Sequence, residues 1–101
     1  MHFMVLGYDG KDEQALERRM AVREAHLNLF RKNFEKGIFI YGAGIQNDQD
    51  KLIGSMIVCD FPSKENLQKE WLDNEPYVTG NVWQEIKISN VLVPPFLLAQ
   101  S

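Results

Sequence analysis

The residues of this chain with the most useful chemistry gather in one predicted helix. They follow one another at steps of four, three and four residues: Arg19, Arg23, His26 and Phe30. On a helix of 3.6 residues per turn this spacing forms a ladder along one side. Two guanidinium groups and an imidazole beside an aromatic ring can hold a carboxylate or phenolate and move a proton near it. The ladder therefore predicts a site for a small anionic or aromatic ligand, centred on His26.

The same spacing also fits a purely structural role. A histidine at the margin of a buried helix face is often half-buried and hydrogen-bonded. Arginines beside an apolar stripe often cover the edge of a core while their charged ends reach water. In this interpretation His26 and its arginine neighbours tie the first helix to the rest of the fold and bind nothing.

The helix that carries the ladder is the clearest periodic feature of the chain. Asp12 is a candidate N-cap, and Gly37 after Lys36 is a typical stop. An apolar stripe recurs at alternating steps of three and four once Arg23 is counted, and it is predicted to face the core: Leu16, Met20, Leu27, Phe30 and Phe34. The ladder then lies along the rim of that buried face, with His26 about a quarter turn from its centre.

Strands and a second helix follow from composition and turn residues. Ser63 is the predicted cap of the second helix, with Leu67, Trp71 and Leu72 facing inward, and Pro76 limits its extent. Four segments rich in β-branched and aromatic residues read as strands: 2–8, 38–45, 52–61 and 82–88. The order βαββαβ predicts an α+β, ferredoxin-like fold, a four-stranded antiparallel sheet with two helices on one face.

The other face of this sheet needs a cover. The first and third strands carry apolar residues on both faces, and a second copy of the chain is the simplest cover because two-fold dimers are the commonest oligomers. The sequence predicts a homodimer. We expect one domain over residues 1–101, with a core of 1–88 and a tail of 89–101 that is tucked onto its own domain or onto a partner subunit.

Composition excludes several classes of function. A net charge of -3 argues against nucleic-acid binding. No apolar run is long enough to span a membrane, the first eight residues lack a basic signal region, and one cysteine, Cys59, fits a reducing compartment. A cytoplasmic location is expected. His2, His26 and Cys59 have no recognised metal-ligand spacing, so neither a metal nor a cofactor is predicted.

Several segments resemble the YciI-like protein family. The most specific is residues 16–27, LERRMAVREAHL, which resembles the family's basic pair followed by R-x-x-H-L on the first helix. Residues 37–42, GIFIYG, and 54–58, GSMIV, resemble its next two strands. Residues 74–78, NEPYV, resemble its D-P-Y/F-V segment. The similarity covers most of residues 1–88 and implies a ferredoxin-like fold, a dimer of the α+β barrel type, and an active site of a first-helix histidine and a carboxylate.

Departures from the family pattern leave open which carboxylate is the partner of His26. Glu75 stands where the family has aspartate, one methylene longer, and Asp73 is the alternative partner of His26. Gly42-Ala43 replaces a Gly-Pro turn, and the chain from Ser89 onward does not match. The expected catalytic residues are His26 with Glu75 or Asp73. The expected substrate-binding residues are Arg19, Arg23, Phe30 and Tyr77.

Two functions from different classes follow from these residues. A histidine oriented by a carboxylate is a general acid and base, and relatives in the wider barrel group include lactone isomerases, dehalogenating enzymes and cofactor-free oxygenases. By analogy, the first hypothesis is a metal-free isomerase- or lyase-type enzyme acting on a small aromatic or lactone acid. The second is a non-catalytic homodimer that binds a small acidic ligand or simply assembles.

Overall fold

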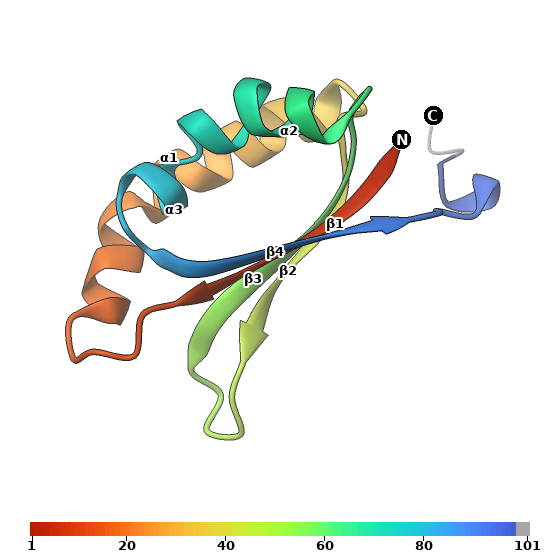
Figure 1. Ribbon diagram of the computed structural model, residues 1–101. Helices are drawn as coiled ribbons and strands as arrows, with labels where there is room; N and C mark the ends of the chain where they lie inside the picture. Colours follow the sequence, from red (N-terminus) through yellow and green to blue (C-terminus); the bar gives the residue numbers. More distant parts are fainter. Residues whose placement is uncertain (99–101) are drawn as a thin grey trace.

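Four strands form one sheet in the order β2-β3-β1-β4, and every neighbouring pair is antiparallel. The computed structural model describes residues 1–98; residues 99–101 of the predicted tail lie outside the described part. Its elements, shown in Figure 1, are β1 (His2–Asp9), α1 (Ala15–Glu35), β2 (Phe39–Gln46), β3 (Leu52–Asp60), α2 (Lys64–Glu70), η1 (Leu72–Asn74), α3 (Pro76–Thr79), β4 (Trp83–Val91) and η2 (Pro95–Leu97).

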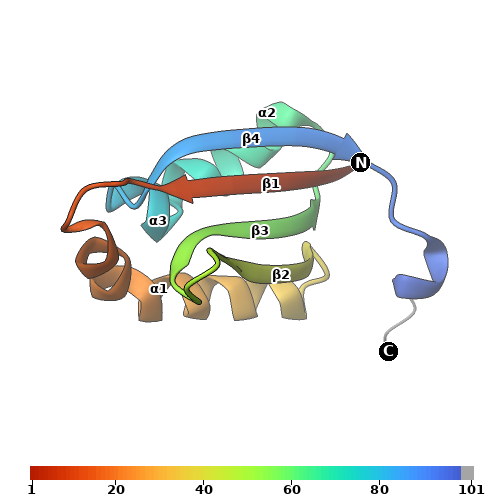
Figure 2. The ribbon, with the colours of Figure 1, turned by 90° about the horizontal axis from the view of Figure 1, so that it is seen from below.

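All three α-helices lie on one face of the sheet (Figure 1). Seen from the other face, α1 runs along the β2 side while α2 and α3 lie toward β4 (Figure 2). This arrangement confirms the predicted ferredoxin-like α+β fold. The predicted strand ends differ from the observed ones by at most three residues, the largest difference being that β4 continues to Val91.

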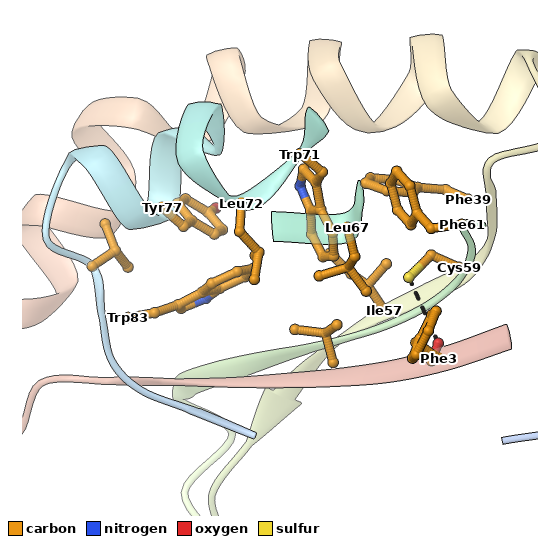
Figure 3. Packing of buried hydrophobic residues seen from close by; sticks show 12 residues of the cluster. Phe3, Phe39, Ile57, Cys59, Phe61, Leu67, Trp71, Leu72, Tyr77 and Trp83 are labelled. Carbon is orange, nitrogen blue, oxygen red and sulfur yellow. Dashed lines mark hydrogen bonds between the residues drawn. The ribbon is translucent and has the colours of Figure 1, made fainter. Parts of the chain in front are cut away.

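The hydrophobic core lies between the sheet and the helices (Figure 3). Along β1 the inward positions Phe3, Val5 and Gly7 are buried, while the alternate positions are only partly buried, as the two-residue period of a strand requires. Cys59 is fully buried, and its Sγ lies 3.7 Å from the carbonyl oxygen of Phe3. The cluster consists of Phe3, Val5, Phe39, Ile57, Cys59, Phe61, Leu67, Trp71, Leu72, Tyr77, Val82 and Trp83.

Helix α1 is rotated relative to the sequence-based prediction. The stripe predicted to face the core is instead largely exposed: Leu16 50%, Met20 54%, Leu27 38% and Phe34 49%. The buried residues of α1 are Ala15, Arg19 and His26. The prediction that this stripe faces the core was therefore wrong by about a quarter turn for these four exposed residues, whereas Phe30, the fifth, is half-buried and packs against the core cluster.

Small residues in the sheet explain the rotation. Gly42 leaves room for Phe30, since a Cβ there would lie 2.6 Å from the Phe30 ring. Gly7 likewise leaves room for the indole of Trp83, which a Cβ would approach to 2.2 Å. Ser55 is the small polar residue of β3 in this region, and it accepts a bond from Arg19. Long polar side chains of α1 therefore fit above the sheet and find partners there, which removes most of the cost of burying them.

The segment after β3 contains one more helix than predicted. Ser63 caps α2 by accepting a hydrogen bond from the Asn66 N–H, as expected. Pro76 does end that helical region, but it also begins the short helix α3, because its fixed φ suits a first helical position. The residue before it, Glu75, is the N-cap of α3.

The chain beyond β4 contacts the first residue of β1. Val93 is buried, and its N–H donates to Nδ1 of His2 at 3.0 Å. Leu92 and Phe96 are 88% and 76% exposed. Within residues 1–98 no helix has both the length and the apolar composition needed to cross a membrane.

Candidate functional site

His26 and Glu75 meet beneath α1. His26 Nδ1 lies 2.8 Å from Glu75 Oε2, and the two side chains are 8% and 0% exposed. The residues come from different elements: His26 from the middle of α1, Glu75 from the turn before α3. Glu75 is thus the carboxylate that partners His26. Asp73 is exposed and accepts a hydrogen bond from the amide of Gln68 instead.

The carboxylate of Glu75 is held by three donors. Its Oε1 accepts from Trp71 Nε1 at 2.9 Å, and its Oε2 accepts from the backbone N–H of Tyr77 at 2.9 Å as well as facing His26. The bond to Tyr77 N–H is the N-cap interaction of α3, where a carboxylate also complements the positive end of the helix. Both oxygens of Glu75 therefore act as hydrogen-bond acceptors.

This arrangement assigns the proton on His26. An ionised carboxylate only accepts hydrogen bonds, so the imidazole nitrogen that faces it, Nδ1, carries the hydrogen. The neutral ring then has an unprotonated Nε2. Within residues 1–98 Nε2 has no hydrogen-bond partner, and His26 lines a cavity. His26 can therefore accept a proton from a molecule in that cavity.

Tyr77 is sandwiched between two side chains of α1, the His26 imidazole and the Arg19 guanidinium. Its ring stacks on His26 with centroids 3.9 Å apart and planes 12° apart, and the Arg19 guanidinium carbon lies 4.7 Å from its centroid. Trp83 packs edge-on against both rings of the stack (Figure 3 shows Trp83 and Tyr77). Burial raises the pKa of the Tyr77 phenol, opposed by the charges of Arg19 and Arg23. These contacts lock the His26 ring in one orientation.

Arg19 is a buried charge with partners inside the protein. Its Nη1 donates to both carboxylate oxygens of Asp9, at 3.0 and 3.1 Å, and its Nη2 donates to Ser55 Oγ at 3.0 Å. Burial raises the pKa of Asp9, and the nearby Arg19 charge opposes that rise. Arg19 Nε is buried and has no hydrogen-bond partner within residues 1–98. The pair holds α1 to the end of β1 and puts a guanidinium beside the Tyr77 ring.

The cavity between α1 and the β2 side of the sheet measures about 250 Å³. Its walls are the predicted site residues Arg19, Arg23, His26, Phe30 and Tyr77, with Leu27, Gly42, Ala43, Gly44, Leu52, Ser55, Met56 and Ile57. Arg23 is exposed at the rim and forms no ion pair within the described chain, so its charge is free for a ligand. The volume suits one small ring, because a cavity of about 150 Å³ already holds benzene.

The structure therefore brings together every predicted site residue except Asp73. Sequence reasoning missed three: Asp9 and Ser55, which hold Arg19, and Trp71, which bonds Glu75. A serine inside the apolar run 54–59 and an acid at the end of β1 were the available signs. Within residues 1–98 no three His, Cys, Asp or Glu side chains are grouped to hold a metal ion.

Known proteins are similar to this chain over most of its length. Residues 1–91 match the family described as the YCII-related domain. The chain belongs to this family. It is 31% identical over 104 residues to an uncharacterised protein of Haemophilus influenzae, an alignment covering 95% of this chain and 96% of the relative. The resemblance to YciI-like proteins expected from residues 16–27 is confirmed.

A solved structure shares the fold of this YCII-related chain. It is 5-chloro-2-hydroxyhydroquinone dehydrochlorinase (TftG) of Burkholderia phenoliruptrix in complex with 2,5-dihydroxybenzoquinone, with a TM-score of 0.77. The match covers 95% of this chain and 98% of that chain at 15% sequence identity. At that identity the likeness supports the fold alone.

Proposed function

We propose that this protein is a metal-free enzyme in which His26, oriented by Glu75, transfers a proton on a small anionic or aromatic ring compound. The observation that carries the proposal is the 2.8 Å contact between His26 Nδ1 and the fully buried Glu75, with Nε2 left at a cavity. A base needs a fixed ring, a fixed tautomer and access to substrate, and this arrangement supplies all three.

The chemistry follows from the two nitrogens of one ring. Nε2 takes a proton from a carbon or hydroxyl of the substrate, and the imidazolium that forms is stabilised by the Glu75 carboxylate. The electron pair left behind moves onto a substrate oxygen, whose charge Arg19 and Arg23 stabilise. Return of the proton to another atom gives an isomer. Departure of a leaving group with its bonding electrons gives an elimination.

The cavity indicates the substrate class. Its size suits a single ring, the faces of Phe30 and Tyr77 suit a planar one, and the unpaired Arg23 suits a carboxylate or phenolate at the rim. The dehydrochlorinase with the same fold acts on a hydroxylated ring by its printed name, which agrees with this class. We extend to this chain only the class, a small hydroxylated or carboxylated ring or its lactone.

We further propose that the protein is a cytoplasmic homodimer whose open sheet faces pack together. The strand alternation directs Met4, Leu6, Met56 and Val58 away from the helices, where they are only partly buried, and Tyr41 is 61% exposed on the same face. A second sheet about 10 Å away would cover them. Cys59 as a free thiol fits a reducing compartment.

A ligand screen with three proteins tests the enzymatic proposal. Small aromatic acids, lactones and catechols are screened by thermal shift against wild type, His26→Ala and the control Asn28→Ala, an exposed residue on the outer side of the same helix. A true ligand raises the melting temperature of wild type and the control but not of His26→Ala. Turnover of that compound should then fall about 10²–10⁴-fold in His26→Ala.

Two outcomes would contradict the proposal in different ways. If a ligand stabilises all three proteins equally and none turns it over, the chain is the non-catalytic binding module. If His26→Ala melts far below the control and no compound shifts any protein, His26 has a structural role and the site binds nothing.

A further inference from the structure

Within residues 1–98 most of the exposed stripe of α1 is uncovered; at its end Phe34 lines a pocket together with Leu97 and Leu98. Leu16, Met20, Leu27 and Phe34 are between 38% and 54% exposed. In Figure 2, α1 forms the margin of the molecule beyond β2, and no helix or strand lies outside it. This surface is distinct from the open sheet face discussed above. Four large apolar side chains in one line are more than the scattered surface residues of an ordinary monomer.

The spacing of the stripe is that of a coiled-coil seam. Positions 16, 20, 23, 27, 30 and 34 alternate steps of four and three, so each falls on an a or d position of a heptad. Four of them are exposed apolar residues and Arg23 is exposed too, whereas Phe30 is half-buried with its ring packed against Gly42 and Phe39. The helix that carries them spans 21 residues, Ala15–Glu35. A seam of this kind packs against another helix. The heptad spacing of α1 therefore describes this exposed seam and not the side of the helix that faces the core.

We propose that α1 is a self-association surface, which pairs antiparallel with α1 of a second copy of this chain. The inference goes beyond the proposed enzymatic function and does not depend on it. In an antiparallel pair each a position faces a d position of the other helix. The register in which paired numbers add to 50 puts Leu16 against Phe34 of the partner subunit and Leu27 against the partner's Arg23, while Phe30 stays packed on the sheet at Gly42 and Phe39.

Charges beside the seam favour this register. The flanking e positions are Glu17, Glu24 and Arg31, all exposed. In the antiparallel pair Glu17 lies beside Arg31 of the partner subunit, and the reverse contact occurs on the other side of the two-fold axis. Glu24 lies at the axis opposite Glu24 of the partner subunit, and the two Arg23 side chains beside the axis offset the repulsion of these like charges. A parallel pair would instead bring Arg23 against the partner's Arg23 in one layer, which like charges disfavour.

The pairing has a consequence for the cavity. Arg23 and Leu27 line the seam and also the rim of the His26 cavity. The two-fold axis passes near residue 25, so the mouths of two cavities open on either side of it. Each mouth then has Arg23 of the partner subunit beside its own Leu27, which adds a cationic group from the second copy to the entrance.

Charge reversal with rescue tests the proposal. Wild type, Glu17→Lys, Arg31→Glu and the double variant are compared by light scattering and analytical ultracentrifugation over a range of concentrations. Each single variant turns two attractive contacts into repulsive ones, so the dissociation constant should rise about 3- to 10-fold. The double variant restores attraction and should return to the wild-type value. Equal dissociation constants for all four proteins would overturn the proposal.

Cysteine cross-linking tests whether the two α1 helices pair antiparallel. It also separates this pairing from any association through the open sheet face. With a short bis-maleimide, Glu24→Cys should link to itself, whereas Glu65→Cys on α2 should not, and Met20→Cys should link less than Glu24→Cys. Faster linking of Met20→Cys, or none of Glu24→Cys above the Glu65→Cys control, would contradict antiparallel pairing. Tyr41→Glu, on the open sheet face, should leave Glu24→Cys linking unchanged.

Discussion

Replacing Glu75 by glutamine perturbs the centre of the site with almost no change in shape. The carboxylate accepts from Trp71 Nε1 on one oxygen and from Tyr77 N–H and His26 Nδ1 on the other. A carboxamide has one oxygen and one NH₂ group. With its oxygen toward Tyr77, the NH₂ meets the Trp71 N–H; with its oxygen toward Trp71, the NH₂ meets the Tyr77 N–H. In both cases one buried N–H loses its acceptor.

The cost of that loss sets the magnitude. An unsatisfied buried donor costs about 1–3 kcal/mol. For a domain of this size each kcal/mol corresponds to about 4–8 °C in melting temperature. Urea unfolding followed by fluorescence gives the free energy of unfolding directly, at one fixed protein concentration because self-association also stabilises. We expect Glu75→Gln to lower it by about 1–3 kcal/mol.

The matched control is Asp73→Asn, two residues away. Asp73 is exposed and accepts one bond from Gln68, so its replacement should change stability by less than about 0.5 kcal/mol. If Glu75→Gln is no more destabilising than Asp73→Asn, the carboxylate of Glu75 does not hold the three donors and the account of the site is wrong.

Three further predictions concern other groups. Arg19→Met leaves the Asp9 carboxylate, 4% exposed, without its partner and should cost about 3–5 kcal/mol. Arg18→Met breaks a pair at the surface and should change the free energy of unfolding far less; urea unfolding of both variants compares them. Hydrogen bonds from Arg18 lower the pKa of Asp12 from 3.8 to about 2. The stability from this pair is therefore present above about pH 4 and lost as the pH falls through about 2, and a carboxyl-carbon NMR titration with a midpoint near 4 would contradict this. Burial raises the pKa of the Cys59 thiol from 9.0 to about 12, so iodoacetamide at pH 8 should modify the unfolded but not the folded protein. For the same reason the free energy of unfolding should fall as the pH rises from about 9. Rapid labelling of the folded protein would refute the burial of this thiol.

The fold followed from the sequence because its elements are locally marked. β-branched and aromatic runs, the cap at Ser63, and the stops at Gly37 and Pro76 each act within a few residues, and the order of elements then selects the topology. Gly37 has φ of 77°, the left-handed conformation that ends a helix and that glycine adopts without strain. These features do not depend on how the elements pack.

The rotation of α1 could not be found in the same way. Apolar periodicity reports which face of a helix is hydrophobic, and we assumed that this face lies in the core of the same chain. The sheet residues that decide otherwise, Gly7, Gly42 and Ser55, come from three different strands. Arg19 and His26 were therefore expected at the rim but are 4% and 7% exposed. The resemblance of residues 16–27 to a family pattern indicated the right residues. The apolar periodicity of the helix alone predicted that they would be less buried than they are.

The choice between Glu75 and Asp73 shows a similar limit. Both carboxylates lie near the end of the second helical region, and a sequence does not reveal that Pro76 starts a new helix. Once α3 begins at Pro76, the preceding residue becomes its cap and is drawn inward. Asp73 lies in the turn η1 on the exposed side.

The most direct test of the account is the tautomer of His26. The chain has two histidines, and the structure assigns them opposite tautomers: His26 donates from Nδ1 to Glu75, while His2 accepts at Nδ1 from the Val93 N–H. Long-range ¹H–¹⁵N NMR at about pH 8.5, where an ordinary imidazole is neutral, distinguishes the two forms, and His2→Gln assigns the signals. We predict that His26 carries its proton on Nδ1 and His2 on Nε2. A His26 protonated on Nε2 would leave no base at the cavity and would contradict the central claim.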